Sequence, residues 1–193
     1  LHAGITYKLE HVAVSLGGFS GGSGVTIANL FRNGLTSSLK GALTYDARND
    51  RMFPSKGYYL QGSSEWADDS LGSDNEFVRL RGNARYYRPI FWKVIFKVNG
   101  NLGYVVPTGD DPLSIYERFF IGGIFNVRGY ERNSLGPEVM VARFRDPGSS
   151  LRDFNIGGNK QFYLNTELEL PLFEQVGIRA VSFLDAGQAY DED

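Results

Sequence analysis

The sequence lacks cysteine and contains only two histidines among 193 residues. Without cysteine there is no disulfide framework and no thiolate zinc site, and two histidines leave little for a transition metal. Lysine and arginine number 20 against 22 acidic residues, so there is no net basic field to neutralise phosphates. We therefore expect no metal, no cofactor and no nucleic acid as a partner.

Long apolar runs are missing as well. No segment provides the roughly 18 consecutive apolar residues of a transmembrane helix, and Lys8 and Glu10 interrupt the region where a signal peptide would be apolar. A membrane β-barrel is compatible with this, because alternating strands give a weak hydropathy signal; the mean hydropathy is −0.25. The chain instead has 24 glycines and 14% aromatic residues, which is typical of turns that join aromatic-rich strands.

Segment 92–104 alternates most clearly. Apart from Gly100, apolar side chains occupy every second position from Trp92 onward, and the positions between them include Lys97, Asn99 and Asn101. A period of two predicts a strand. Its length exceeds the usual 5–6 or so residues and suits the roughly 9–11 residues with which a tilted strand crosses a bilayer.

Similar segments occur along the whole chain, at 5–16, 38–46, 58–66, 77–87, 115–121, 162–172 and 178–190. Arginines share one face of 77–87, which requires water on that side. We predict one all-β domain over 1–193 with about eight antiparallel strands, a short loop helix at 25–33 and an unusually long connection at 122–160. A soluble sandwich or ligand-binding β-barrel has the same alternation, so periodicity alone leaves that alternative open.

One hydrolase-like pattern is present, Gly18-Phe19-Ser20-Gly21-Gly22, which matches Gly-x-Ser-x-Gly. The serine lies in a run of glycines, and His2 and His11 both precede it, so the triad order expected with this pattern is absent. We expect a loop here, no catalytic residue, and no enzyme.

The long connection carries the strongest local signal. A surface loop of this length would ordinarily be polar, yet Ile124, Phe125, Val127 and Tyr130 surround Arg128. Such a loop is suited to pack against another surface while it presents one guanidinium group.

These residues resemble a known family. Val127-Arg128-Gly129-Tyr130 is similar to the Val-Arg-Gly-Phe/Tyr signature of the BamA-type outer-membrane assembly and secretion superfamily. Further matches follow the family's order: Asp46-x-Arg48-Asn49 with Phe53-Pro54-x-Lys56-Gly57, Glu167-Leu168-Glu169-Leu170-Pro171, and Phe183-Leu184-Asp185-Ala186-Gly187.

The resemblance implies an antiparallel transmembrane β-barrel of sixteen strands, of which this chain would be a C-terminal fragment without the periplasmic domains and terminal strands. Its open edge strands would have to pair with each other, giving a small barrel of about eight strands, or with another copy by self-association, or the fragment would be stable only in detergent or in a larger assembly. The Asp46, Arg48, Pro54 and Gly57 motif would form a turn between barrel strands.

The resemblance also implies a site. The loop 122–160 would fold into the lumen, where Arg128 would pair with Glu167 and Asp185 as a positional latch. Arginine suits this role because its planar fork binds carboxylates bidentately and stays charged. Gly129 would permit the turn, and Tyr130 would wedge against the wall.

For the function, the resemblance implies insertion and folding of β-barrel proteins in a bacterial outer membrane. The expected partners are outer-membrane lipids, unfolded β-barrel client proteins and, in the parent protein, assembly-machinery lipoproteins. Because the fragment would lack the seam between first and last strands, we expect it to be inactive alone. A two-partner secretion pore of the same superfamily and a soluble ligand-binding β-barrel are the alternatives.

Overall fold

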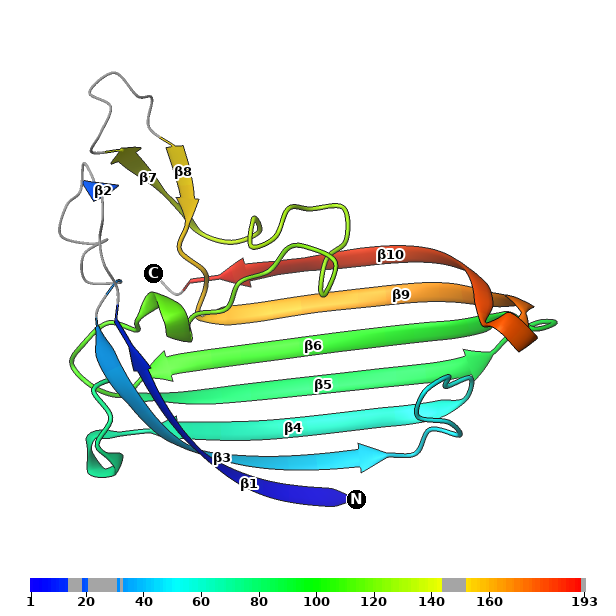
Figure 1. The fold of residues 1–193 in the computed structure, drawn as a ribbon, viewed down its shortest axis with the longest axis horizontal. Helices are drawn as coiled ribbons and strands as arrows, with labels where there is room; N and C mark the ends of the chain where they lie inside the picture. Colours follow the sequence, from blue (N-terminus) through cyan, green and yellow to red (C-terminus); the bar gives the residue numbers. More distant parts are fainter. Residues whose placement is uncertain (14–18, 21–30, 32, 144–151, 192–193) are drawn as a thin grey trace.

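The computed structural model describes residues 1–13, 19–20, 31, 33–143 and 152–191. Long antiparallel strands form one sheet of seven in the order β1-β3-β4-β5-β6-β9-β10 (Figure 1). Their bounds are His2–Val12 for β1, Gly34–Asp46 for β3, Gly57–Ala67 for β4, Phe77–Pro89 for β5, Ile95–Pro107 for β6, Lys160–Phe173 for β9 and Ile178–Tyr190 for β10. The predicted all-β antiparallel fold is therefore confirmed.

A small second sheet stands at one end of the large one. It consists of β2 (Phe19–Ser20), β7 (Glu138–Arg143) and β8 (Arg152–Asn155), in the order β2-β7-β8. Of the connection 122–160, the first part and the last residues lie against the large sheet, where Val105 of β6 donates its N–H to the backbone oxygen of Asn159 at 2.8 Å. Between them, β7 and β8 rise away from the sheet as a hairpin (Figure 1). Among the described residues, no helix is long and apolar enough to span a bilayer.

Some predicted elements differ from the structure. The predicted strand 5–16 is observed as β1, which begins at His2 and ends at Val12, and the predicted strand 38–46 begins earlier, at Gly34. Segment 115–121 is not a strand: Ile115–Glu117 forms the 3-10 turn η2, and only isolated bridges involve Phe119 and Ile121. The predicted strand 92–104 is shifted, because residues 90–94 form the hairpin turn, in which Trp92 has a φ of 48°. The predicted helix at 25–33 lies almost entirely outside the described residues.

The two faces of the large sheet differ in polarity. On the outer face, large apolar side chains are open to the surroundings; Leu43 and Leu102, for example, are each 60% exposed. The inner face carries polar side chains, including Asn99 and Asn165, which lie directly opposite each other on β6 and β9, and Asn83 on β5, one diagonal step from Asn99. Apolar side chains outside and polar ones inside are the pattern of a membrane barrel wall, which contradicts the soluble alternative.

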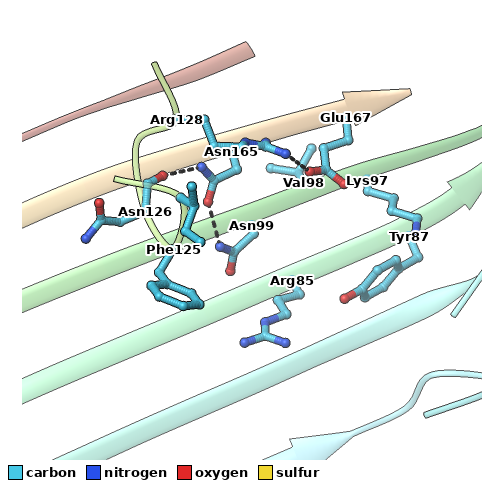
Figure 2. Close-up of a pocket in the computed structure, with 11 residues that line it drawn as sticks. Arg85, Tyr87, Lys97, Val98, Asn99, Phe125, Asn126, Arg128, Asn165 and Glu167 are labelled. Carbon is cyan, nitrogen blue, oxygen red and sulfur yellow. Dashed lines mark hydrogen bonds and ion pairs between the residues drawn. The ribbon is translucent and has the colours of Figure 1, made fainter. Parts of the chain in front are cut away.

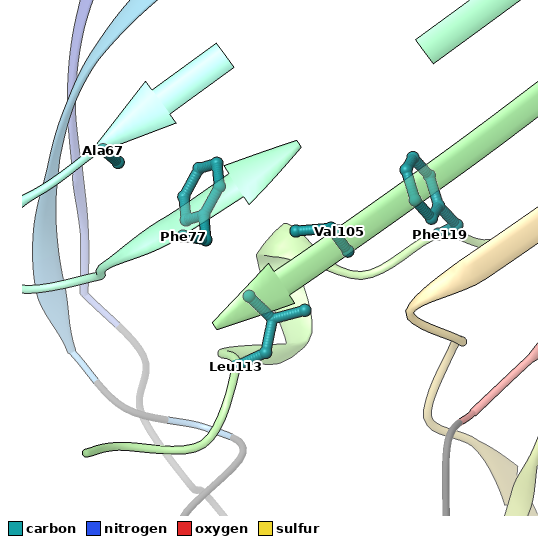
Figure 3. Packing of buried hydrophobic residues seen from close by; sticks show 5 residues of the cluster. All are labelled: Ala67, Phe77, Val105, Leu113 and Phe119. Atoms are coloured by element: carbon teal, nitrogen blue, oxygen red, sulfur yellow. The ribbon is translucent and has the colours of Figure 1, made fainter. Parts of the chain in front are cut away.

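The inner face is covered at one end by the segment that follows β6. Leu113 and Phe119 from this segment pack with Ala67, Phe77 and Val105 of the sheet, and all five are buried (Figure 3). Apolar residues alternate in 115–121 because one side of this segment packs on the sheet. The segment does not join the sheet as a strand, although the same alternation led to the prediction of one.

Candidate functional site

The two predicted carboxylates lie on neighbouring strands. Glu167 is opposite Phe183, and Asp185 is opposite Asn165, so both acids project from the inner face of β9 and β10, one diagonal step apart. Diagonal neighbours on one face are within reach of a long side chain. The sheet therefore offers a preformed pair of acids to a cation that approaches from the lumen.

Arg128 is that cation. Its Nε donates to Asp185 Oδ2 at 2.6 Å and its Nη2 to Asp185 Oδ1 at 2.7 Å, which is the bidentate arrangement. Nη1 donates to Glu167 Oε1 at 2.6 Å. The backbone N–H of Arg128 also donates to Asp185 Oδ2, at 3.0 Å. The structure thus brings together the three residues of the predicted latch.

The surroundings strengthen this contact. The Asp185 side chain is only 2% exposed, while that of Arg128 is 24% exposed. The guanidinium carbon lies 3.7 Å from the centre of the Phe183 ring, which adds a cation–π contact. Hydrogen bonds to Asp185 and Glu167 raise the pKa of Arg128 above its ordinary value, so it stays charged.

A chain of amide side chains supports the loop beside the latch (Figure 2). Asn83 donates to Asn99 at 2.8 Å, Asn99 donates to Asn165 at 2.8 Å, and Asn165 donates to the backbone oxygen of Asn126 at 2.5 Å. The Asn126 side chain in turn accepts from the backbone N–H groups of Gly122 and Val127, both at 2.8 Å. The row of asparagines, of which the sequence analysis named only Asn99 and without a role, therefore positions the loop turn.

Apolar packing holds the other side of the loop. Val127 is 1% exposed and clusters with Ile121 and Ala189. A Cβ atom added to Gly187 would lie 2.9 Å from Val127 Cγ2, so glycine is required for this close approach.

The predicted wedge is wrong. Tyr130 is 56% exposed, and Val127 is the signature residue that packs against the wall. Gly129 has a φ of 89°, which supports the predicted turn role. The apolar character of the signature therefore serves packing before Arg128 rather than after it.

A cavity of about 230 Å³ remains between the loop and the wall. Arg85, Lys97 and Asn99 line the wall side (Figure 2). Phe125 lies on the loop side and is 89% exposed. The latch therefore leaves water-accessible space beside it.

The predicted turn motif lies between β3 and β4. Arg48 donates to both carboxylate oxygens of Asp46, each at 2.8 Å. Gly57 has a φ of 109°, and a Cβ atom there would lie 2.2 Å from the backbone oxygen of Ala47. Pro54 is buried. These contacts close the turn.

The side chain of Asp50 stabilises the same turn by accepting hydrogen bonds from the turn's backbone. Its Oδ1 accepts the backbone N–H groups of Met52 and Phe53, each at 2.7 Å. The N–H groups of Phe53 and Met52 lower the pKa of Asp50 below its ordinary value.

A second ionic network was missed by the sequence analysis. Arg79 donates to Glu65 at 2.9 Å and to Glu117 at 2.5 Å, and all three side chains are buried. Ser38 and Thr36 donate to the remaining carboxylate oxygens at 2.9 and 3.0 Å. Glu117 comes from the 3-10 turn η2, so this network fastens the covering segment to the sheet. The only sequence signal was the set of arginines on one face of β5.

The hydrolase-like pattern lies mostly outside the described residues. Ser20 lies in the short strand β2, whereas Gly18, Gly21 and Gly22 and the serine side chain lie outside the described residues. Within the described part of the chain, no group of three or more acidic or histidine side chains could hold a metal ion.

Several known proteins are similar to this chain in sequence. The chain is similar to the human sorting and assembly machinery component 50 homolog, with 31% identity over 133 residues, which are 69% of this chain and 28% of that protein. It is similar to outer membrane protein assembly factor BamA of Nitratidesulfovibrio vulgaris, with 28% identity over 148 residues, 77% of this chain and 17% of that protein. The chain thus spans less than a third of the length of either relative.

The fold is also similar to a solved structure, that of BamA from Haemophilus ducreyi lacking POTRA domains 1-3. The TM-score is 0.71 over 83% of this chain and 31% of that chain, at 24% sequence identity. The Omp85 superfamily domain matches residues 7–193. The resemblance seen in the motifs is therefore confirmed: the chain belongs to the Omp85 superfamily of outer-membrane β-barrel proteins.

Proposed function

We propose that this chain is part of the barrel of an outer-membrane protein assembly factor, which inserts and folds other β-barrel proteins in a bacterial outer membrane. The observation that carries the proposal is the fastening of the signature loop to the inner wall, where Arg128 contacts Glu167 and Asp185. The similarity to proteins whose names describe assembly supports an assembly function for this chain.

The mechanism needs no covalent chemistry. The loop that carries Arg128, called the inner loop here, ties β9 to β10, because Arg128 binds Glu167 on β9 and Asp185 on β10. Asn165 of β9 also donates to the backbone oxygen of Asn126 in this loop. The rigid wall would thus be held in one shape while client strands are added elsewhere in the barrel. Outer-membrane lipids would surround the apolar outer face, and unfolded β-barrel clients and assembly-machinery lipoproteins would be the protein partners.

Folding kinetics test the proposal. The protein that carries this chain is reconstituted in liposomes, and the folding of an unfolded outer-membrane β-barrel protein is timed. We expect faster folding than in empty liposomes, and slower folding with Arg128→Ala than with the matched control Arg132→Ala. Equal rates with and without the protein would refute the assembly function, and a wide, stable conductance in planar bilayers would then favour the secretion alternative.

A further inference from the structure

The two ends of the sheet differ sharply in charge. The turns at the end that carries the long connection, 68–76 and 108–111, contain six acidic residues and no cation. At the opposite end lies the turn of the β5–β6 hairpin, where residues 88–93 contain the two cations Arg88 and Lys93 and no acid. We call residues 88–93 the hairpin tip; it lies at the right-hand end of β5 and β6 in Figure 1.

The hairpin tip is apolar as well as cationic. Ile90, Phe91 and Trp92 are all exposed, and the Trp92 side chain is 94% exposed. The two rings of Phe91 and Trp92 contact each other edge to face, with centres 6.2 Å apart. Trp92 also holds a φ of 48°, a conformation that non-glycine residues rarely adopt. Within the described residues, almost nothing covers this indole.

The hairpin tip continues the apolar outer face. Arg88 lies opposite Phe96 and alternates with Tyr86, so its side chain projects on the outer side. Tyr58, opposite Tyr86, stacks on Tyr45 with ring centres 5.5 Å apart. Tyrosine and tryptophan concentrate where hydrocarbon meets headgroups, and a long cationic side chain at a strand end reaches toward the headgroup phosphates.

We infer that the hairpin tip is a lipid anchor that lies in the headgroup layer and binds anionic phospholipid through Arg88 and Lys93. The inference rests on the proposed membrane location of the barrel. It adds a preference for negatively charged headgroups at one defined turn, because lysine and arginine side chains close to a membrane surface attract anionic lipids. Short turns of membrane barrels face the periplasm, so the lipid would belong to the inner leaflet.

The two tryptophans of the chain make the test direct. Trp66→Phe leaves Trp92 as the only reporter at the tip, and Trp92→Phe leaves Trp66, which is on the outer face of β4. Each variant of the full chain is reconstituted in vesicles of phosphatidylcholine and phosphatidylglycerol, with bromine on one lipid at a time. Bromine placed near the headgroup should quench Trp92 more strongly than bromine near the methyl end of the acyl chain.

The charge preference is measured in the same vesicles. At low salt, brominated phosphatidylglycerol should quench Trp92 roughly fivefold more effectively than brominated phosphatidylcholine, and the ratio should fall as salt screens the charges. Arg88→Gln with Lys93→Gln should bring the ratio to about one. Arg81→Gln with Arg85→Gln removes the same charge from the inner face of the same hairpin and should leave it unchanged.

The outcomes separate the anchor from the membrane proposal. If lipid bromine quenches Trp66 but not Trp92, and aqueous iodide quenches Trp92, the anchor is overturned while the barrel stays in the bilayer. If lipid quenches neither tryptophan, both proposals fail. An equal effect of the tip and inner-face double variants would overturn the assignment of the charge preference to Arg88 and Lys93.

Discussion

Arg128→Ala is the most informative single change. The substitution removes three side-chain hydrogen bonds to Asp185 and Glu167 and leaves the Asp185 carboxylate, 2% exposed, with the backbone N–H of residue 128. Removing one partner of a buried ion pair costs about 3–5 kcal/mol. Because Arg128 and Glu167 are each about a quarter exposed, water can replace part of the lost contact. We therefore expect about 3 kcal/mol, the lower end of the range.

This free energy should appear as local opening of the loop. A loss of about 3 kcal/mol raises the open population roughly 100-fold. The amides of Gly123 and Leu135 report on it, because they donate to Val127 and Ile121 within the loop, at 3.1 and 2.9 Å. Hydrogen exchange at these amides should therefore accelerate by a similar factor, while exchange in the β5–β6 pairing should not change.

Three further variants complete the experiment. Arg128→Lys keeps the charge but loses the bidentate geometry, so its hydrogen-exchange rate should lie between those of the unchanged protein and Arg128→Ala. Asp185→Asn in the Arg128→Ala background neutralises the stranded carboxylate and should restore part of the protection. Arg132→Ala, four positions away in the same loop, is the control. Equal acceleration in Arg128→Ala and Arg132→Ala would refute the latch.

Other predictions concern neighbouring contacts. Glu117→Ala should detach the segment after β6, at a cost of about 3–5 kcal/mol because Arg79 stays buried without this partner, and proteolysis of that segment would report it. Gly187→Ala should open the inner loop and also disturb the β9–β10 pairing, because the added Cβ meets Val127 Cγ2 at 2.9 Å, Tyr163 Cβ at 2.6 Å and the backbone oxygen of Phe162 at 2.8 Å; hydrogen exchange at both places checks this. The pKa of Asp50 is lowered in the fold, so its stabilisation of the β3–β4 turn is present above the unfolded pKa of about 4 and is lost as the pH falls through the folded value; Asp50→Asn should remove that pH dependence in thermal unfolding scans.

Each of these has its own control. Glu117→Gln keeps the shape and part of the hydrogen bonding, so it should be milder than the alanine variant. Gly4→Ala places a Cβ where nothing lies within 4 Å and should leave the inner loop closed. Asp69 lies in the next turn, and Asp69→Asn should leave the acid dependence intact.

Periodicity predicted the strands because barrel strands must alternate at every position between hydrocarbon and water. The strand 178–190 was predicted with its observed bounds, and 77–87 within two residues. The same rule failed at 115–121, where apolar side chains alternate because one side packs on the sheet. Nothing in a single sequence distinguishes packing over a sheet from pairing within it.

The site was predictable only where the sequence resembles known motifs. The signature identified Arg128, and the resemblance implied Glu167 and Asp185 as its partners. The buried role of Glu117 was missed, because its contact with Arg79 depends on how a loop folds back over the sheet. The resemblance implied that Tyr130 wedges against the wall, whereas this residue, which follows the turn at Gly129, is 56% exposed.

The central claim is a sheet with lipid on one face and a wet lumen on the other, and single-cysteine labelling tests it most directly. The chain has no native cysteine, so each variant along β6 carries one thiol. In liposomes, a charged maleimide should label cysteines at Asn99 and Asn101 rapidly and those at Phe96, Val98 and Leu102 hardly at all. Labelling without this two-residue alternation, or with the pattern reversed, would contradict the account.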